Sequence, residues 1–569
     1  MSIIDWIVLF STLLLIVLYG IYKSRNINNI EGFLLSNREL PWYNVGLSVM
    51  ATQASAITFL SAPGLAFTSG MSFVQFYFGL PLAMIVLCIT FVPIFHKLQV
   101  FTAYEFLEKR FDIKTRSLTA ILFLIQRGIS TGITIFAPSI ILSAVLHIDV
   151  FYTTIIIGSV VVLYTTYGGT KAVSYTQLLQ MGIIFAGLLV AGLMVIHYLP
   201  SEIGFVDALH IAGESNKTNA IDFNFDWNNQ YTIWTGLIGG FFLQLSYFGT
   251  DQSQVGRYLT GASIRESRMG LLMNGLLKIP MQFCILLIGV LVFVYYQYNQ
   301  SPLFFNPTEI QKIENSVYAG DYEKLKAQQK QLTDERTITL NALHQANQSG
   351  NIEEILTNKK QLKEINIASA ELRESTIKLI KANDSKAESN DNNYIFLSFV
   401  TSVFPKGLIG LLIAIIMLAS MGATSSAINS LASTTVIDIY KRLINKQASE
   451  KAYLHASRIS TFGWGVFTII VALFASKLGN LLEAVNILGS LFYGTILGIF
   501  LVAFYFKKIS GNAVFWAALC TETVIVYIWL QDKIAFLWLN LIGCVLVILF
   551  SYLFEFFLPK KTVIKDSNI

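Results

Sequence analysis

Charged residues are scarce in this chain. Only 13% of its 569 residues are Asp, Glu, Lys or Arg, whereas 54% are hydrophobic. Soluble proteins carry about 25% charged residues. The shortage excludes an ordinary soluble domain of this length and predicts that most of the chain faces lipid or is buried in a membrane bundle. The net charge of +5 is not gathered into a basic patch, so nucleic acid is not an expected partner.

Cysteine is equally rare. Cys88, Cys284, Cys520 and Cys544 all lie in apolar runs, without metal-site spacing and without a disulfide framework. The chain also lacks a His/Cys/Asp/Glu cluster, a nucleotide-binding loop and a nucleophile elbow. We therefore expect no organic cofactor and no enzymatic activity.

Long apolar runs are what the chain has in quantity. Thirteen of them predict membrane-spanning helices, because about 20 apolar residues cross about 30 Å of hydrocarbon. They are 4–22, 42–66, 73–98, 117–146, 150–168, 172–198, 231–250, 270–299, 394–437, 455–475, 479–506, 512–530 and 534–556. The run 394–437 is too long for one straight crossing, so we expect it to tilt or to extend beyond the membrane. The fold class is thus an all-α polytopic membrane protein.

Lysine and arginine concentrate in alternate loops. The basic loops include "FLEKRFDIKTR", "GRYLTGASIRESR" and "YKRLINKQASEKAYLHASR", whereas "FTSGMS" and "HIDV" carry few positive charges. Positive loops stay in the cytoplasm. The pattern predicts an integral inner (plasma) membrane protein with its N-terminus outside and its C-terminus in the cytoplasm.

One region departs from this pattern. Residues 308–393 are polar and charge-dense, with apolar residues at helical spacing that "NQSGN" (347–351) interrupts. This predicts two helices joined as an external hairpin. We interpret the hairpin as a solvated cap. A partner-binding arm is the alternative, and its partner is unknown.

Polar residues inside the apolar runs are functional candidates, because unpaired polar atoms in lipid are costly. The stretch "VMATQASAITFLSAPG" (49–64) contains Thr52, Gln53, Ser55 and Thr58. Its small residues and Pro63 favour a broken helix, whose free carbonyl groups bind Na⁺ in many transporters. Close packing of small residues between helices is the alternative.

A second stretch, "MLASMGATSSAINSLASTTVIDIY" (417–440), is crowded with hydroxyl groups. Gly422, Ser426, Asn429 and Ser433 fall on one helical stripe, with Ser425 beside it. Hydroxyl oxygens are ligands suited to Na⁺. Tight packing, with Ser and Thr bonded to their own helix backbone, is the alternative.

Other polar residues lie singly in apolar runs. Gln244 and Tyr247 are one turn apart, and Lys278 lies about midway along its run. A buried lysine requires a partner, a water-filled cavity or a shifted pKa, unless it extends to the cytoplasmic rim. For Arg127 we expect one of two contacts: an anionic substrate, or a carbonyl group at a helix end. These groups line spans instead of a soluble pocket, which favours passage of a solute.

The order of motifs resembles the sodium:solute symporters, the family of the sodium–glucose, proline, sialic acid and iodide/multivitamin transporters. The motifs are "SAITFLSAPGLAF", "YEFLEKRFD", "YTTYGGTKAVSYTQLLQ", "GTDQSQVGRYLTG" and "NSLASTTVIDIYKR". The resemblance covers most of 1–506. It implies a LeuT-like fold of two inverted five-helix repeats whose first helices are broken.

The resemblance also implies a division of the chain. An extra N-terminal helix and cytoplasmic loop precede the first repeat, and two extra C-terminal helices follow the second. The segments are 1–41, the first repeat 42–198, an external loop 199–230, the second repeat 231–506 interrupted by the hairpin 308–393, the extra helices 507–558 and a cytoplasmic tail 559–569.

By the same resemblance, the main sodium site takes backbone carbonyls at Ala51, Ala54 and Ala419. Its two hydroxyl positions fall on Gly422 and Ala423, which carry none. A lost oxygen ligand weakens a cation site.

A second sodium site takes Ser425 and Ser426, with an Asp that is replaced by Gln177 in "TQLLQ". The replacement weakens this site also, because it removes a counter-charge. The resemblance implies sodium as the coupling ion, and the lost ligands leave H⁺ coupling or no coupling as alternatives.

Substrate positions carry over as well. The resemblance places substrate at Gln244, Lys278 and Asn486, with Tyr247 as the inner gate. The sialic acid branch adds Ser55 and Thr58, and Gln75 lies in a stretch that lines family sites.

We expect a cation-coupled symporter that imports a small polar organic solute by alternating access. A sugar or sugar acid is the first choice, because Gln244 and Lys278 supply neutral hydrogen-bonding groups and one positive charge. A carboxylate or a vitamin is the alternative. A transporter-like sensor or receptor is a further alternative, disfavoured because the chain ends about a dozen residues after its last helix.

Overall fold

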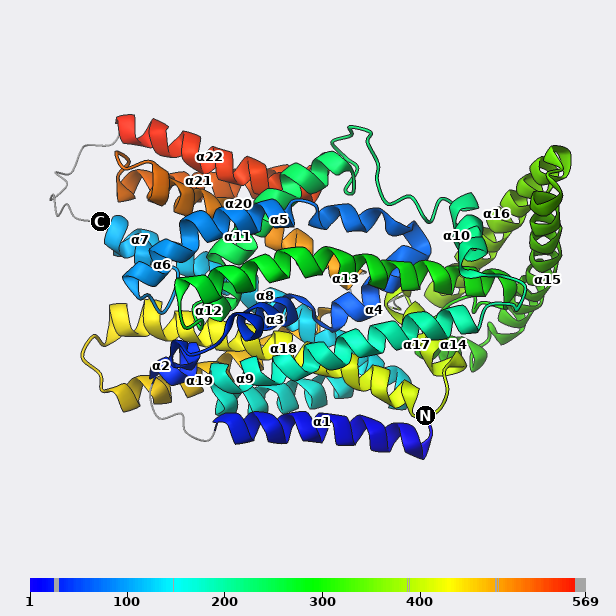
Figure 1. Cartoon of the computed structure of the whole chain (residues 1–569), viewed down its shortest axis with the longest axis horizontal. Helices are drawn as coiled ribbons and strands as arrows, with labels where there is room; N and C mark the ends of the chain where they lie inside the picture. The colour runs from blue at the N-terminus through cyan, green and yellow to red at the C-terminus, as the bar shows by residue number, and fades with distance from the viewer. Residues whose placement is uncertain are drawn as a thin grey trace.

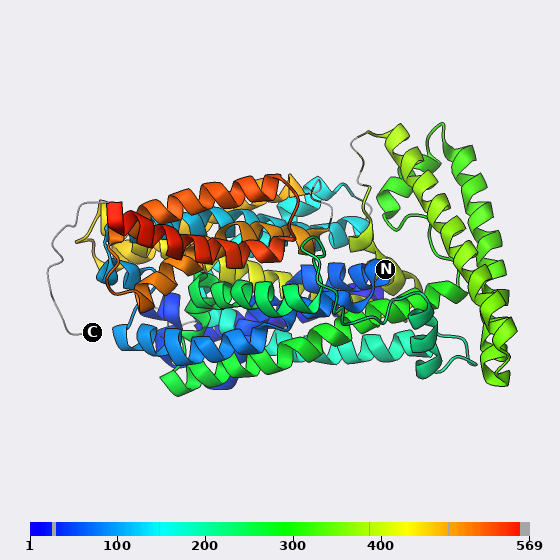
Figure 2. The same cartoon turned by 90° about the horizontal axis from the view of Figure 1, so that it is seen from above.

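The computed structural model of the chain describes residues 1–24, 30–146, 148–385, 387, 389–475, 478 and 480–557. Helices run side by side along the long axis of an elongated bundle, and two long helices stand across one end (Figures 1 and 2). Within the described residues the only β-type pairing is an isolated bridge between Leu40 and Gly261. The proposed tail 559–569 and part of the first loop lie outside the described residues.

The bundle contains most of the helices. They are α1 (Ile3–Ser24), α3 (Trp42–Gln53), α4 (Ala56–Ser69), η2 (Met71–Tyr77), α5 (Leu80–Val86), η3 (Leu87–Phe91), α6 (Val92–Leu98), α8 (Ile113–Leu146), α9 (Val150–His197), η4 (Thr235–Gly239), α11 (Gly240–Thr250), α13 (Ile264–Tyr298), α17 (Asn392–Val403), α18 (Leu408–Thr434), η5 (Thr435–Ile444), α19 (Glu450–Ala472), α20 (Leu481–Tyr505), α21 (Gly511–Leu530) and α22 (Phe536–Phe557).

Shorter helices and the long pair lie at the two ends. They are α2 (Ile30–Leu35), η1 (Ser36–Arg38), α7 (Glu105–Arg110), α10 (Phe205–Glu214), α12 (Gln252–Tyr258), α14 (Pro307–Glu314), α15 (Ala319–Ser349) and α16 (Ile352–Asn383).

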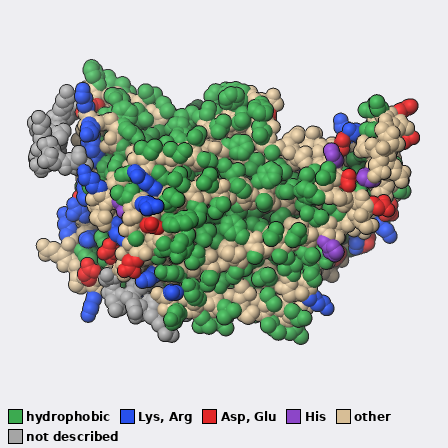
Figure 3. Space-filling model, in the orientation of Figure 1, with side chains coloured by type: hydrophobic (Ala, Val, Ile, Leu, Met, Phe, Trp, Pro, Cys, Tyr) green, Lys and Arg blue, Asp and Glu red, His purple; other side chains and the backbone are tan. Residues whose placement is uncertain are grey.

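In the described part of the chain, nine helices are long and apolar enough to cross a membrane, or ten when one bent pair is counted as a span. Hydrophobic side chains cover the middle of the surface, and Lys and Arg gather at the end opposite α15 and α16 (Figure 3). The hydrocarbon core of a bilayer would cover this hydrophobic middle band. The count of thirteen spans and the orientation stay predictions.

The first of the predicted broken helices is present. The axes of α3 and α4 differ by 59°. Between them, Ala54 leaves the helical conformation (φ −83°, ψ 79°) and Ser55 is extended. A second break lies at Asp251, which is extended between α11 and α12, and its side chain accepts from the Ser253 amide. Both breaks leave helix-end backbone groups free for other partners.

The predicted helices 150–168 and 172–198 form one element, α9. Thr165 and Gln177 lie twelve residues apart in it, yet they hydrogen-bond to the adjacent residues Ser425 and Ser426. A straight helix would separate them by about 18 Å. We infer that α9 folds back near its middle, so that the two predicted helices are its two arms.

The prediction of one long helix over 394–437 is wrong. The chain breaks after α17, and Gly407, with φ of +90°, precedes α18. Pro405 cannot donate a helical hydrogen bond. The Asp5 carboxylate of α1 accepts from the amides of Gly407 and Gly410, so it caps the new helix start and joins α1 to α18.

The predicted helical hairpin is confirmed as α15 and α16. Gly350 ends α15 in the left-handed conformation (φ +69°), which glycine adopts without steric cost. Leu340, Leu343 and Leu362 are buried between the two helices. The short helix α14 before the hairpin was not predicted.

Candidate functional site

A cavity of about 90 Å³ lies at the centre of the bundle. It is bounded by the break between α3 and α4 and by α8, α11, α18 and α20. Its polar lining residues are Thr52, Gln53, Ser55, Thr58, Tyr77, Arg127, Ser130, Thr131, Thr134, Tyr247, Asn486 and Tyr493. The unwound joint places side chains of both half-helices on one wall.

The structure brings four of the predicted substrate and gate residues together. Ser55 and Thr58 follow the break, Tyr247 comes from α11, and Asn486 comes from α20. All four line the same cavity. Their roles as substrate and gate residues stay predictions.

Gln75 is placed elsewhere. Its Nε2 donates to the Tyr231 carbonyl at 2.8 Å, and its Oε1 accepts from the Asp222 amide at 2.9 Å. Gln75 does not line the central cavity. Its amide ties the loop before η4 to η2, which leaves little hydrogen-bonding capacity for a substrate.

Gln244 and Lys278 lie behind the cavity wall. The Gln244 Oε1 accepts from Gln53 at 3.4 Å, and Gln53 lines the cavity. The Lys278 side chain is fully buried, and its Nζ lies 5.5 Å from the ring centroid of Tyr77, another lining residue. The Lys278 Nζ and the Gln244 Nε2 have no hydrogen-bond partner in the structure. Both reach a solute only if Gln53 and Tyr77 move.

Arg127 pairs with a carboxylate. Its Nη1 lies 3.7 Å from Asp251 Oδ2, and its guanidinium lies 5.7 Å from the Tyr247 ring centroid. Tyr493 donates to the same Asp251 oxygen at 2.8 Å. The expected contact with a helix-end carbonyl is therefore replaced by an ion pair at the second helix break. Asp251 thus neutralises the one arginine that lines the cavity.

Sequence reasoning missed Asp251 and Tyr493. The signal for Asp251 was its position in "GTDQS", directly after the apolar run of α11. A lone acid at the end of such a run is a candidate partner for a lysine or arginine in another helix. Tyr493 had no such signal, because a tyrosine in an apolar helix is ordinary.

The predicted hydroxyl ligands face α9. Gln177 Nε2 donates to Thr52 Oγ1 at 3.2 Å, to Ser426 Oγ at 3.1 Å and to the Gly422 carbonyl at 3.2 Å. Ser48 donates to Gln177 Oε1 at 2.6 Å. The amide nitrogen therefore lies among three oxygens, in the kind of setting that a cation takes.

Ser425 takes part in a separate contact. Its Oγ accepts from Thr165 Oγ1 at 2.8 Å. Ser425 and Ser426 are both fully buried and do not line the central cavity. Each hydroxyl therefore already links α18 to the bent helix α9.

The two positions without hydroxyl groups differ in their surroundings. Ala423 lines the central cavity. A Cβ at Gly422 would lie 2.5 Å from Gln180 Oε1, so the Gln180 amide fills the space of a side chain there. That Oε1 is buried and has no hydrogen-bond partner. An unpaired acceptor at this place is an oxygen available to a cation.

The three predicted carbonyl ligands belong to buried residues. Ala51 and Ala54 lie at the end of α3, and Ala419 lies in α18. Across the described residues, no group of three or more His, Cys, Asp or Glu residues could hold a metal ion. The sodium site stays a prediction.

A buried ion network closes the end of the bundle that bears α7. Arg116 contacts Asp438 of η5 and Glu108 of α7, each at 2.7 Å. Arg442 also pairs with Glu108, and Thr102 donates to Asp438 at 2.8 Å. The network joins α7, α8 and η5.

Comparisons with known proteins place the chain in a family. A family model described as the sodium:solute symporter family matches residues 33–319 and 374–520. The gap between these matches contains nearly all of α15 and most of α16. Most of the hairpin therefore lies outside the residues that the family model matches.

Named relatives are transporters. The sodium/sialic acid symporter NanT of Aliivibrio fischeri is 24% identical over 97% of this chain and 92% of its own. The sodium-coupled monocarboxylate transporter 1 of Xenopus laevis is 26% identical over 89% of this chain and 68% of its own. The human sodium/iodide cotransporter is 30% identical, but the match spans only 47% of this chain and 41% of that protein.

A solved structure supports the fold. A Na⁺-coupled sialic acid symporter in a substrate-bound outward-open state superposes with a TM-score of 0.75 over 98% of both chains, at 21% identity. The likeness confirms the expected LeuT-like, all-helical fold. At this identity it carries no argument about the solute.

Proposed function

Because the chain belongs to the sodium:solute symporter family, we propose that it imports a small polar organic solute together with sodium, by alternating access. It is a multi-pass membrane protein. The proposed location is the inner (plasma) membrane, with the N-terminus outside and the C-terminus in the cytoplasm. The observation that carries the proposal is the polar cavity at the α3–α4 break.

A sugar or sugar acid is the first choice of solute. Ser55, Thr58 and Asn486 offer hydroxyl and amide groups around the cavity, and such groups match a solute with many hydroxyls. Asp251 neutralises Arg127, so this arginine attracts an anion only weakly, and the unpaired Lys278 behind Tyr77 would add a hydrogen-bond donor once that ring moves. A monocarboxylate or a vitamin remains the alternative.

Sodium coupling would use one ion. The Gln177 amide donates hydrogen bonds to the oxygens that would coordinate the second sodium ion. A cation there would face the N–H hydrogens and would have to displace them. The main site, between the end of α3 and Ala419, keeps its backbone carbonyls and gains Gln180 Oε1 as a candidate ligand.

The cycle would follow from the two helix breaks. Sodium bound between α3 and α18 would hold the first break in the shape that presents Ser55 and Thr58 to the solute. Tyr247 accepts a hydrogen bond from Gln254 of α12 at 2.7 Å. Movement of α12 at the second break would carry the Tyr247 gate with it and open the inner path.

Uptake into proteoliposomes tests the function. Radiolabelled sialic acid, lactate, biotin and glucose are offered with an inward Na⁺ gradient, with choline, or with an inward H⁺ gradient. We expect uptake of sialic acid with Na⁺ alone, and its loss in Thr58→Ala and Asn486→Ala. Uptake that depends on the H⁺ gradient, or on neither gradient, would contradict sodium coupling. Sodium-dependent binding of these solutes without any uptake would favour a sensor or receptor.

A further inference from the structure

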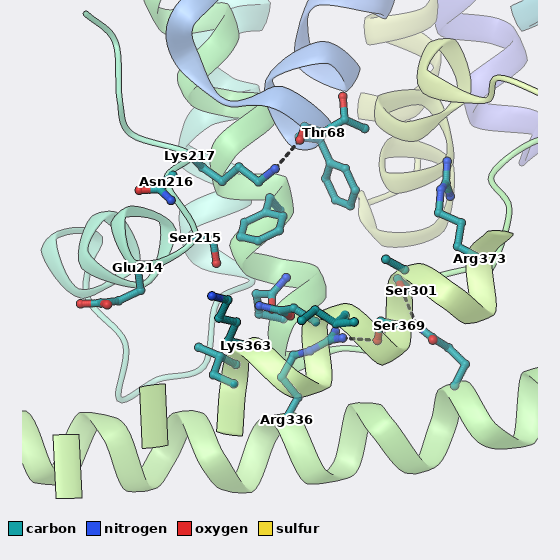
Figure 4. Close-up of a pocket in the computed structure, with 18 of the residues that line it drawn as sticks. Thr68, Glu214, Ser215, Asn216, Lys217, Ser301, Arg336, Lys363, Ser369 and Arg373 are labelled. Carbon is teal, nitrogen blue, oxygen red and sulfur yellow. Dashed lines mark hydrogen bonds between the residues drawn. The ribbon is translucent and has the colours of Figure 1, made fainter. Parts of the chain in front are cut away.

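A second and larger cavity lies outside the central site. It has a volume of about 780 Å³ and separates the hairpin from the ends of α4 and α13 (Figure 4). Ligand pockets commonly have volumes of about 300 to 1,000 Å³. We call this space the outer cavity. It is large enough for an organic molecule, not only for an ion.

Basic side chains dominate the charged lining of the outer cavity. Its charged residues are Lys217, Arg336, Lys359, Lys363, Arg373 and the single acid Glu214. Lys359 pairs with Glu214 at 2.8 Å, and Arg373 pairs with Asp391. Among the described residues the other three cations enter no ion pair. The cavity therefore holds three positive charges without counter-ions.

Arg336 is the most constrained of these charges. Only 4% of its surface is exposed, its Nη2 donates to the Ser369 hydroxyl, and its Nε has no partner. Burial lowers the pKa of Arg336 to about 10, so the group stays charged at neutral pH. A buried guanidinium without a carboxylate is costly. A bound anion would remove that cost.

Lys217 and Lys363 approach from two other elements. Lys217 follows α10, donates to the Thr68 carbonyl and lies 5.2 Å from the Phe293 ring centroid. Lys363 is an exposed residue of α16. Figure 4 shows both side chains and Arg336 around one space. Their convergence from separate elements distinguishes a binding site from a charged helix face.

Neutral hydrogen-bonding groups complete the lining. The Gln329 Oε1 is buried without a partner, while its Nε2 donates to Ser301 at 3.1 Å. Asn366 and Gln297 line the same space. Amides beside cations suit a molecule that carries hydroxyl groups as well as an anionic group.

Helix α4 contributes residues to the lining of both cavities. Phe67 and Thr68, at the end of α4, form part of its floor, and Thr58 of the same helix lines the central cavity. Ten residues separate Thr58 from Thr68, about 15 Å along a helix. The Phe67 ring packs against Phe293 and Phe305, with centroids 5.7 Å apart in each pair. These rings lie at the floor of the outer cavity.

We propose that the outer cavity binds a small organic anion with a carboxylate and hydroxyl groups, held by Arg336, Lys217 and Lys363. It would collect a sugar acid at the hairpin before the solute reaches the central site. The binding site stands on this geometry alone. Only the claim that the bound anion is also the transported solute rests on the proposed function.

Calorimetric titration of the full chain in phosphatidylcholine nanodiscs, in sodium buffer, tests this site. Sialic acid is the anionic probe and glucose the neutral one. We expect two sialic acid sites in the wild type and one in Thr58→Ala/Asn486→Ala, with no glucose bound at the remaining site. Lys363→Ala should weaken that site at least ten-fold, because it removes a charge-assisted contact.

The matched control is Lys360→Ala, an exposed lysine of the same helix that does not line the cavity. It should leave the outer site unchanged. Equal sialic acid affinities in Lys363→Ala and Lys360→Ala overturn the proposal. Arg336→Gln should act like Lys363→Ala, and since Lys363 is exposed, the test does not depend on the Arg336 variant folding.

Two further arms identify the anion. Inorganic phosphate that displaces sialic acid at equal concentration overturns the organic-anion assignment, as does anionic phosphatidylglycerol that abolishes binding. For uptake, Lys363→Ala should raise KM several-fold with Vmax unchanged. If the chain transports nothing but the outer site still binds sialic acid through Lys363, the proposed function fails and the binding site stands.

Discussion

Gln177 joins three helices through one amide group. Its amide nitrogen lies within hydrogen-bonding distance of Thr52, Ser426 and the Gly422 carbonyl. Buried polar groups of this kind are stable only when each is paired. Through these hydrogen bonds the Gln177 side chain links α9 to α3 and to α18.

Gln177→Asp should restore a cation site. The shorter carboxylate would leave space among the three oxygens and would add the missing negative charge. We expect the Hill coefficient for sodium in uptake to rise from about 1 toward 2. Gln177→Asn is the control, because asparagine has the length of aspartate without its charge. It should not raise the Hill coefficient. An unchanged coefficient in Gln177→Asp would contradict the proposed role of the amide.

At the scale of elements, the broken helix is held by close backbone contacts. Gly289 of α13 meets Pro63 of α4, and Gly64 meets the Asn392 carbonyl at the start of α17. A side chain at either glycine would separate the helices. The half-helix α4 therefore packs closely against both α13 and α17. These contacts orient the helix that carries Ser55 and Thr58.

Gly289→Ala should destabilise the protein. The new Cβ would lie 2.2 Å from the Pro63 carbonyl oxygen, which is backbone and cannot rotate away. Overpacking of this kind costs about 1–3 kcal/mol, so the thermal midpoint should fall by several degrees in detergent. Gly182→Ala, where no atom lies within 4 Å of the added Cβ, is the control. Equal midpoints in both variants would disprove the close contact.

The network at Glu108 should make the α7 end sensitive to acid. Hydrogen bonds from Arg442 and then Arg116, acting against burial, hold the pKa of Glu108 below its ordinary value of 4.5. Because the folded-state pKa is the lower one, this stabilisation is complete above the ordinary value. It is lost as pH falls through the folded-state value.

The thermal midpoint, measured from pH 6 down to pH 3, checks this expectation. Glu108→Gln should reduce the wild-type loss of stability over the acid part of the range. Glu374→Gln, in an exposed ion pair with Lys378, should keep the wild-type profile. The same acid profile in Glu108→Gln as in the wild type would contradict the prediction.

At the scale of the whole molecule, the proposed sodium ion and the proposed solute would both bind at the α3–α4 break. Sodium between α3 and α18 and solute at Ser55 and Thr58 would both stabilise the same arrangement of the α3–α4 break. Two ligands that favour one state raise each other's affinity by the same factor. Coupling of this kind would need no contact between ion and solute.

Sodium and solute together should raise the thermal midpoint by more than the sum of their separate effects. Each ligand stabilises the folded state by RT ln(1 + [L]/Kd), about 2.7 kcal/mol at 100 times Kd. A coupling of about 1–3 kcal/mol would add to this. Thermal shifts in Na⁺ or choline, with and without sialic acid, measure the excess. Strictly additive shifts would contradict coupling through the break.

Much of the fold was predictable because lipid imposes a strong pattern. The low charge and the apolar runs indicated a helical membrane bundle, "ATQASAITF" indicated a broken helix, and "NQSGN" marked the turn of the hairpin. The division of 394–437 was missed even though Pro405 and Gly407 lie within it. Hydropathy alone does not register a four-residue break.

The sequence by itself determined the composition of the bundle, the family motifs and the absence of hydroxyl groups at 422 and 423, since these depend on residue type. Only the tertiary structure decided the partners. Asp251 neutralises Arg127, the Gln177 amide lies among the α3 and α18 oxygens, and Lys278 lies behind Tyr77. Such pairs join residues that are distant along the chain, so their contacts arise only from helix packing.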